Sequence, residues 1–92
     1  MNVIIKSNGE ITPAVPKNGT DFCLDELRAV VDGWIEVVYL QDKDKHLMVV
    51  NEEGKSLKLP YNAKATYIYQ NHTGCNDVIV GDVLVCENDK IK

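Results

Sequence analysis

The stretch WIEVVYLQDKDKHLMVVN, Trp34 to Asn51, decides the fold of this chain. Its two apolar segments, residues 34–40 and 46–51, are rich in the β-branched and aromatic residues that favour strands. The polar residues QDKDK between them are typical of a turn. The two segments are therefore predicted to form an antiparallel β-hairpin.

Side chains of the first strand alternate between two faces of the sheet. Trp34 and Glu36 share one face with two aliphatic residues, and Ile35 and Val37 mark the other face as the expected core side. Glu36 is then expected to point outward, on a face too apolar to be simple solvent surface. We expect this face either to be covered by the chain's own loops or to be offered to a partner.

Two short strands and a helix are expected before the hairpin. Residues 3–5 are a β-type run that stops at a hairpin-turn dipeptide, and two prolines confine residues 11–19 to an edge strand or an extended loop. The helix is predicted over TDFCLDELRAVVDG, with Thr20 or Asp21 as its N-cap and Gly33 as its C′ residue. Its apolar stripe comprises Phe22, Leu24, Leu27, Val30 and Val31.

After the hairpin, residues 51–54 (NEEG) are expected to form a turn and residues 55–59 (KSLKL) a third strand, completing a meander. Asn62 is a good N-cap, and a short helix is predicted over residues 62–70, although TYIY within it favours a strand. The run NDVIVGDVLVCEN is nearly continuous in apolar residues. It predicts a central strand covered on both faces, with a bulge or bend at Gly81-Asp82.

These segments predict one α+β domain over residues 1–92, with a mostly antiparallel sheet of five or six strands and one or two helices on a face. A chain of 92 residues buries roughly 60–65% of the surface its unfolded form exposes, so one hydrophobic core is expected rather than two. No apolar run reaches the ~20 residues that span a bilayer, and the N-terminal segment is too polar for a signal peptide. We expect a cytoplasmic protein with no membrane partner.

The net charge of −4 opposes binding to a nucleic-acid duplex, which needs a basic face. Residues 43–64 nevertheless carry five lysines against three acids. They predict either a local basic patch for an anionic ligand or lysines on solvated turns, and the second interpretation is favoured.

No motif predicts catalysis, a metal or a cofactor. The three cysteines do not form a disulfide framework, and His72, Cys75 and Cys86 are interpreted as a loop histidine and two buried thiols rather than a zinc site. Three groups of acids could converge with Glu36 for acid–base chemistry, but the sequence alone does not show convergence. These groups are Asp25-Glu26, Glu52-Glu53, and Asp77 with Asp82.

The aromatic residues could stack a nucleotide base, anchor a protein partner, or complete the core and its rim. Tyr67 and Tyr69 would share a face on a strand and point apart on a helix. Five residues are predicted to bind a ligand or partner: Trp34, Glu36, Tyr61, Asn62 and Tyr67.

Three motifs occur in order: VDGWIEVVYL, VVNEEGKSLKLPYNAKAT and DVIVGDVLV. The series, over about residues 22–86, resembles an uncharacterised family, a domain of unknown function in small proteins of bacteriophages and mobile elements. The chain departs from the pattern at Asp32-Gly33 and in the loop NHTGCN. The resemblance implies a phage or mobile-element accessory protein and brings no catalytic residue with it.

We expect a small non-enzymatic binding module in the cytoplasm of the bacterial host. It would interfere with a host (defence) process by binding a host protein or by sequestering a small anionic ligand. The alternatives are a nucleic-acid-binding accessory protein that uses the 43–64 patch and a small nucleotide-handling hydrolase. A homo-oligomer is compatible with the sequence, because the proline-containing edge and the last strand could add to the sheet of another chain.

Overall fold

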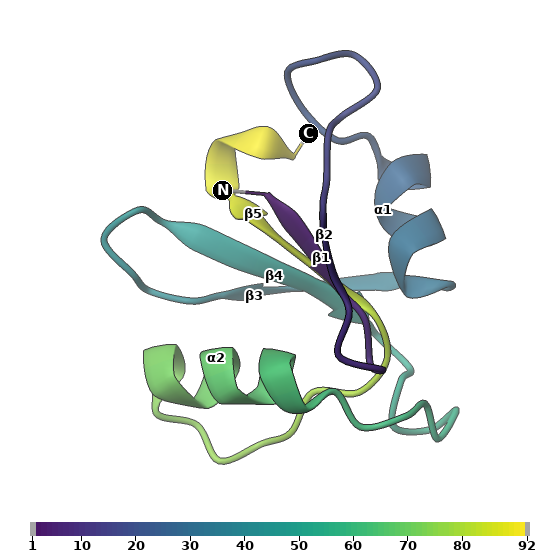
Figure 1. Ribbon diagram of the computed structural model, residues 1–92, viewed down its shortest axis with the longest axis vertical. Coiled ribbons are helices and arrows are strands. Elements are labelled where there is room, and N and C mark those ends of the chain that lie inside the picture. Colours follow the sequence, from purple (N-terminus) through teal and green to yellow (C-terminus); the bar gives the residue numbers. More distant parts are fainter. Residues whose placement is uncertain (1, 92) are drawn as a thin grey trace.

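Five strands form one sheet, and one helix covers each of its faces (Figure 1). The computed structural model describes residues 2–91; the predicted domain also includes Met1 and Lys92, which lie outside the described residues. The strand order is β2-β1-β5-β4-β3, and every neighbouring pair is antiparallel. The strands are β1 Val3–Ile5, β2 Ile11–Pro13, β3 Ile35–Tyr39, β4 His46–Asn51 and β5 Val83–Glu87. The helices are α1 Leu24–Val31, α2 Ala63–Thr73 and the short 3₁₀ helix η1 Asn88–Lys90. The predicted α+β class is confirmed.

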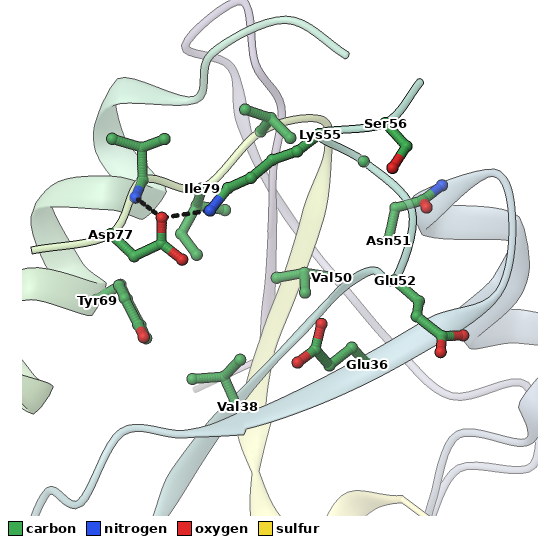
Figure 2. Close-up of a pocket in the computed structure, with 13 residues that line it drawn as sticks. Glu36, Val38, Val50, Asn51, Glu52, Lys55, Ser56, Tyr69, Asp77 and Ile79 are labelled. Carbon is green, nitrogen blue, oxygen red and sulfur yellow. Dashed lines mark hydrogen bonds and ion pairs between the residues drawn. The ribbon is translucent and has the colours of Figure 1, made fainter. Parts of the chain in front are cut away.

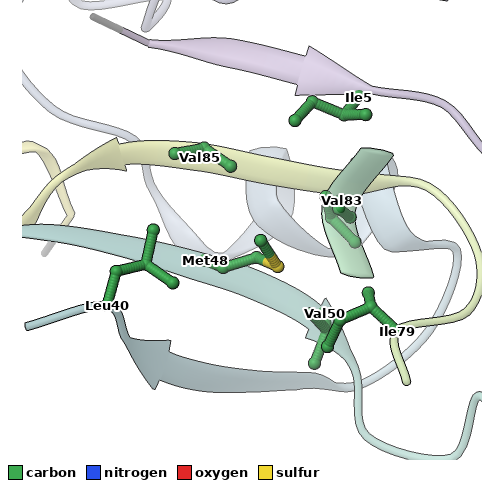
Figure 3. Close-up of a cluster of buried hydrophobic side chains, with 8 residues drawn as sticks. Ile5, Leu40, Met48, Val50, Ile79, Val83 and Val85 are labelled. Atoms are coloured by element: carbon green, nitrogen blue, oxygen red, sulfur yellow. The ribbon is translucent and has the colours of Figure 1, made fainter. Parts of the chain in front are cut away.

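The sheet separates two hydrophobic clusters, so the expectation of a single core is wrong. Successive residues of β4 alternate between them: Leu47 and Val49 belong to the cluster under α1, and Met48 and Val50 to the cluster under α2. The α1-side cluster comprises Ala14, Phe22, Leu27, Val31, Leu47, Val49, Leu84 and Cys86. The α2-side cluster, shown in part in Figure 3, comprises Ile5, Leu40, Met48, Val50, Ala65, Ile79, Val83 and Val85.

β5 is a central strand, as its apolar run predicts. It lies between β1 and β4, and residues 83–86 are all buried. The residues before it form a loop that bends at Gly81, which has a φ of +78°. A Cβ there would lie 2.9 Å from the Leu59 side chain, so both the backbone angle and the space favour glycine.

α1 begins later than predicted, with Cys23 as its N-cap. The side chain of Asn18 accepts the backbone N–H groups of Thr20 and Asp21 at 2.8 and 2.9 Å, which holds these residues in a turn before the helix. Phe22 then forms an isolated bridge to Ile91 near the far end of the chain. The predicted caps Thr20 and Asp21 are therefore wrong.

The C-terminal end of α1 is capped from β4. Asp32, not Gly33, takes the left-handed conformation, with a φ of 57°. The buried Asn51 side chain donates to the carbonyls of Val31 (3.0 Å) and Asp32 (3.3 Å). A Cβ on Gly33 would lie 2.6 Å from the Asn51 amide nitrogen, so glycine is needed here for close approach rather than for a positive φ.

The predicted hairpin of β3 and β4 is confirmed, but the predicted third strand at residues 55–59 is wrong. Residues 52–58 form consecutive turns. Backbone hydrogen bonds from Leu57 to Glu53 (2.9 Å) and from Leu59 to Gly54 (3.0 Å) close them. The predicted second helix is confirmed: it begins after Asn62 and extends to Thr73, beyond the predicted end.

Candidate functional site

A pocket of about 170 Å³ opens on the α2 side of the sheet, beside β3 (Figure 2). Residues from five segments line it, namely β3, β4, the turns after β4, α2 and the loop before β5. Its volume suits a group the size of a side chain rather than a drug-sized ligand, whose pockets occupy about 300–1,000 Å³. The lining residues are Glu36, Val38, Val50, Asn51, Glu52, Gly54, Lys55, Ser56, Tyr69, Asp77, Val78, Ile79 and Val80.

The lining of the pocket is apolar on the sheet and acidic at the rim. Val50 and Ile79 are buried, and Val38 and Tyr69 pack partly buried against the same cluster. Glu36 and Glu52 are exposed, and within residues 2–91 neither side chain makes a hydrogen bond or an ion pair. An aliphatic chain that ends in a cation matches both parts of this lining.

The one lysine of the pocket is already paired. Lys55 forms an ion pair with Asp77, drawn as a dashed line in Figure 2, and this contact holds the pKa of Asp77 below its usual range. Asp77 also accepts the backbone N–H of Val78 at 2.9 Å. The two glutamates therefore keep a net negative charge in the pocket after the lysine and the aspartate cancel.

Of the five predicted binding residues, only Glu36 lines this pocket. The Trp34 ring lies instead 4.0 Å from the Arg28 guanidinium of α1, a cation–π contact. Trp34 precedes β3 and does not line the pocket with Glu36, although the alternation along the strand predicted a shared face.

Tyr61 and Tyr67 lie outside the pocket as well. Tyr61 is half exposed and bridges to Val80. Tyr67 is 70% exposed on α2, beside Ile11 and Lys64 in a shallow apolar groove. The helix turns Tyr67 and Tyr69 in different directions, so only Tyr69 lines the pocket.

Asn62 is a structural residue. Its side chain is 1% exposed, and it donates to the carbonyls of Ile5 (3.0 Å) and Gly81 (2.8 Å) while accepting the N–H of Ala65 (3.1 Å). These bonds occupy both amide hydrogens and the helix-facing oxygen. The residue joins α2 to β1 and to the bend before β5.

Sequence reasoning missed most of this pocket. It weighed Glu52 and Asp77 as partners of Glu36, and both do line the pocket. It weighed Lys55 only as one of the five lysines of residues 43–64 and Tyr69 only within an aromatic group. Asp77 and Tyr69 are far from β3 along the chain, so the sequence alone does not show that they line the same pocket as Glu36.

The three residues weighed for zinc do not meet. Cys86 is buried on the α1 side of the sheet, where burial raises the pKa of its thiol to about 11. Cys75 is exposed, which corrects the expectation of a buried thiol; a hydrogen bond with the Tyr69 hydroxyl and backbone N–H groups lower its pKa. His72 lies in the last turn of α2, with Nδ1 2.9 Å from the Ile68 carbonyl oxygen.

A second group of side chains joins Asp42 and Asp44, in the turn between β3 and β4, to His46, the first residue of β4; its possible ligand atoms lie within 4.8 Å of one another. Asp42 accepts the backbone N–H of His46 at 2.6 Å, and its other oxygen lies 2.6 Å from the ring Nδ1. Burial acts to raise the pKa of Asp42, but these contacts together lower it. These contacts close the turn, and this structural role accounts for the short distances within the group.

The lysines of residues 43–64 do not form one basic patch. Lys43 and Lys45 precede β4, whereas Lys55 and Lys58 follow it, about 20 Å away at the usual rise of a six-residue strand. Lys64 donates to the Gly9 carbonyl at 2.6 Å. This arrangement favours the interpretation of lysines on separate turns.

Within the described part of the chain, no helix has the length and apolar character needed to cross a bilayer. No curated protein and no solved structure matches the chain. The model of one protein family, a domain of unknown function designated DUF3846, matches residues 1–92. Because this match covers the whole chain, the protein, with its antiparallel sheet, two α-helices and acidic pocket beside β3, belongs to the DUF3846 family.

Proposed function

We propose that this protein is a non-enzymatic binding module whose pocket receives a lysine or arginine side chain of a protein partner. The observation that carries the proposal is the pair of unpaired carboxylates, Glu36 and Glu52, at the rim of an apolar pocket. A cation would pair with these carboxylates, and its aliphatic stem would lie on Val38 and Val50. A small anionic ligand, the other expected partner, would meet two like charges instead.

The pocket alone supports only weak binding. Burying three methylenes contributes about 2.4 kcal/mol, and an exposed ion pair adds about 0.2–1 kcal/mol. The sum of about 3 kcal/mol corresponds to a dissociation constant above about 1 mM. A stable complex therefore needs further contacts with the partner.

Within the phage or mobile-element context, we propose that the partner is a host protein in the bacterial cytoplasm and that binding interferes with a host process. The resemblance described above supports this context. A protein that acts by occupancy needs no catalytic residue.

The test is a titration of the ¹⁵N-labelled protein with a short, capped peptide that alternates threonine and valine around one central lysine. Amide shifts are expected at Glu36, Glu52 and Val38, and a peptide with a central glutamate should cause none. Glu36→Gln and Glu52→Gln should each weaken binding, by about two- to fivefold for one exposed ion pair.

Glu53→Gln is the matched control, because Glu53 is also exposed and adjoins Glu52 but does not line the pocket. Equal effects of the Glu36, Glu52 and Glu53 variants would overturn the proposed site.

A further inference from the structure

β3 lies at the edge of the sheet, and its outer side pairs with no strand among the described residues. The Trp34 carbonyl accepts from Glu52 (2.9 Å), and the Leu40 N–H donates to His46 (3.1 Å), so even-numbered residues bond toward β4. In an antiparallel ladder this role alternates along the strand. The N–H and C=O groups of Ile35, Val37 and Tyr39 therefore point away from the sheet.

The β3 edge lacks most of the features that usually block an edge strand, and its one charged residue is Glu36. The opposite edge, β2, has three residues and ends in Pro13. β3 has five residues, IEVVY, with no proline, glycine or lysine. Proteins usually protect such an edge with prolines, lysines, bulges or a covering segment. An unprotected edge can accept an extended segment by strand addition.

The same edge borders the acidic pocket. Glu36 and Val38, which bond toward β4, line that pocket. An antiparallel strand added outside β3 would meet them as non-hydrogen-bonded pairs, in which opposing Cα atoms are only about 4.5 Å apart. A lysine or arginine opposite Glu36 would therefore emerge on the pocket side of the sheet, close to both glutamates.

A second copy of this chain fits the edge poorly. An antiparallel pair of β3 strands centred on Val37 would set Glu36 against Val38 of the other copy, and centring on Glu36 would oppose two like charges. Both arrangements leave the glutamate without a cation, and each chain carries a net charge of −4. Charge complementarity selects a basic segment of a different protein.

We propose that β3 binds an extended segment of a protein partner as a sixth strand, with one lysine or arginine of that segment opposite Glu36 and in the pocket. The segment would carry β-branched or aromatic residues opposite Val37 and Val38, since both lie partly buried on β3. This inference rests on the proposed function and supplies the additional contacts that the pocket lacks.

The test measures amide hydrogen exchange by NMR, with and without the peptide that carries the central lysine. In the free protein, the amides of Val37 and Tyr39 are expected to exchange faster than those of Glu36 and Val38. With peptide bound, protection at Val37 and Tyr39 should rise at least about tenfold, as expected of amides that enter a ladder.

Tyr39 offers a matched pair of variants, because its side chain is 61% exposed and its N–H faces outward. Tyr39→Ala keeps that N–H, and Tyr39→Pro removes it. Peptide binding to the proline variant should be at least about fivefold weaker than to the alanine variant, the value of one hydrogen bond. Circular dichroism should show that both variants are folded.

Four results would overturn the strand addition. Glu36-dependent binding without new protection at Val37 and Tyr39 would leave the proposed function standing and remove this inference. Equal binding by the two Tyr39 variants would have the same effect. Protection that rises with protein concentration alone would assign the edge to a second copy, and absence of binding by the lysine peptide would remove both proposals.

Discussion

Replacement of the buried Asn62 by alanine is expected to cost about 3–5 kcal/mol of folding free energy. The change removes the N-cap acceptor of α2, typically about 1 kcal/mol. It also leaves the carbonyls of Ile5 and Gly81 without their donor in a buried position, at about 1–2 kcal/mol each. The whole domain of 92 residues is expected to be stable by about 5–14 kcal/mol, so a large share of its stability would be lost.

The assay is urea unfolding followed by far-ultraviolet circular dichroism. With an m-value of about 1.5 kcal/mol/M, a cost of about 4 kcal/mol lowers the midpoint by about 2.5 M. Asn62→Ser retains an acceptor for the Ala65 N–H and should recover about 1 kcal/mol. Asn71→Ala is the control, because Asn71 is exposed on the same helix and its side chain bonds, among residues 2–91, only to the Tyr67 carbonyl.

A cost for Asn62→Ala of about 1 kcal/mol or less would refute this reasoning, because it would show that Asn62 acts only as a helix cap. A midpoint shift as large in the Asn71 variant would refute it as well. The distinction is therefore between a local cap and a link from α2 to β1 and the bend before β5.

Three further predictions concern other contacts. Gly33→Ala should lower the free energy of unfolding by about 1–3 kcal/mol through overpacking against the Asn51 amide. The double variant Gly33→Ala, Asn51→Ala should lose less than the sum of the two single losses, and additive losses in urea unfolding would contradict the contact. Cys75 should be alkylated by iodoacetamide at lower pH in the folded protein than in the unfolded chain, because folding lowers its pKa. Tyr69→Phe should slow this reaction, and an unchanged alkylation rate of the variant, measured by mass spectrometry, would count against the hydrogen bond. Asp42→Asn should destabilise the protein by about 1 kcal/mol near pH 7 and by less near pH 3. The pKa of Asp42 is lower in the folded state, so its charge stabilises the fold at pH values above the unfolded pKa. This stabilisation is lost as the pH falls through the folded pKa. Thermal unfolding with equal losses at both pH values would argue against a role for the Asp42 charge.

Local patterns predicted the elements whose partners lie nearby in the sequence. The hairpin of β3 and β4 follows from two β-rich runs around a polar turn, and the start of α2 follows from the capping preference of Asn62. The alternation of Leu57 and Leu59 was misleading, because two leucines cannot distinguish a short strand from turns in which one of them is half-buried and the other exposed.

Distant partners explain the remaining errors. The start of α1 depends on Phe22, whose N–H donates to the Lys90 carbonyl at 2.6 Å. The pocket depends on residues 69 and 77–80, which reach β3 only through the fold. The predicted role of Glu36 stays a hypothesis, now with defined neighbours, whereas Asn62 already uses its side chain within the fold.

The central place of β5 has a consequence for synthesis. β5 follows the other four strands along the chain, yet it joins β1 to β4. Until residues 83–87 leave the ribosome, the β1–β2 and β3–β4 hairpins lack their common neighbour, and isolated hairpins are at best marginally stable. The sheet is therefore completed only after the other four strands have been translated, by long-range pairing that is slow and prone to aggregation. A chaperone that shields the two hairpins until β5 arrives should raise the yield of folded protein.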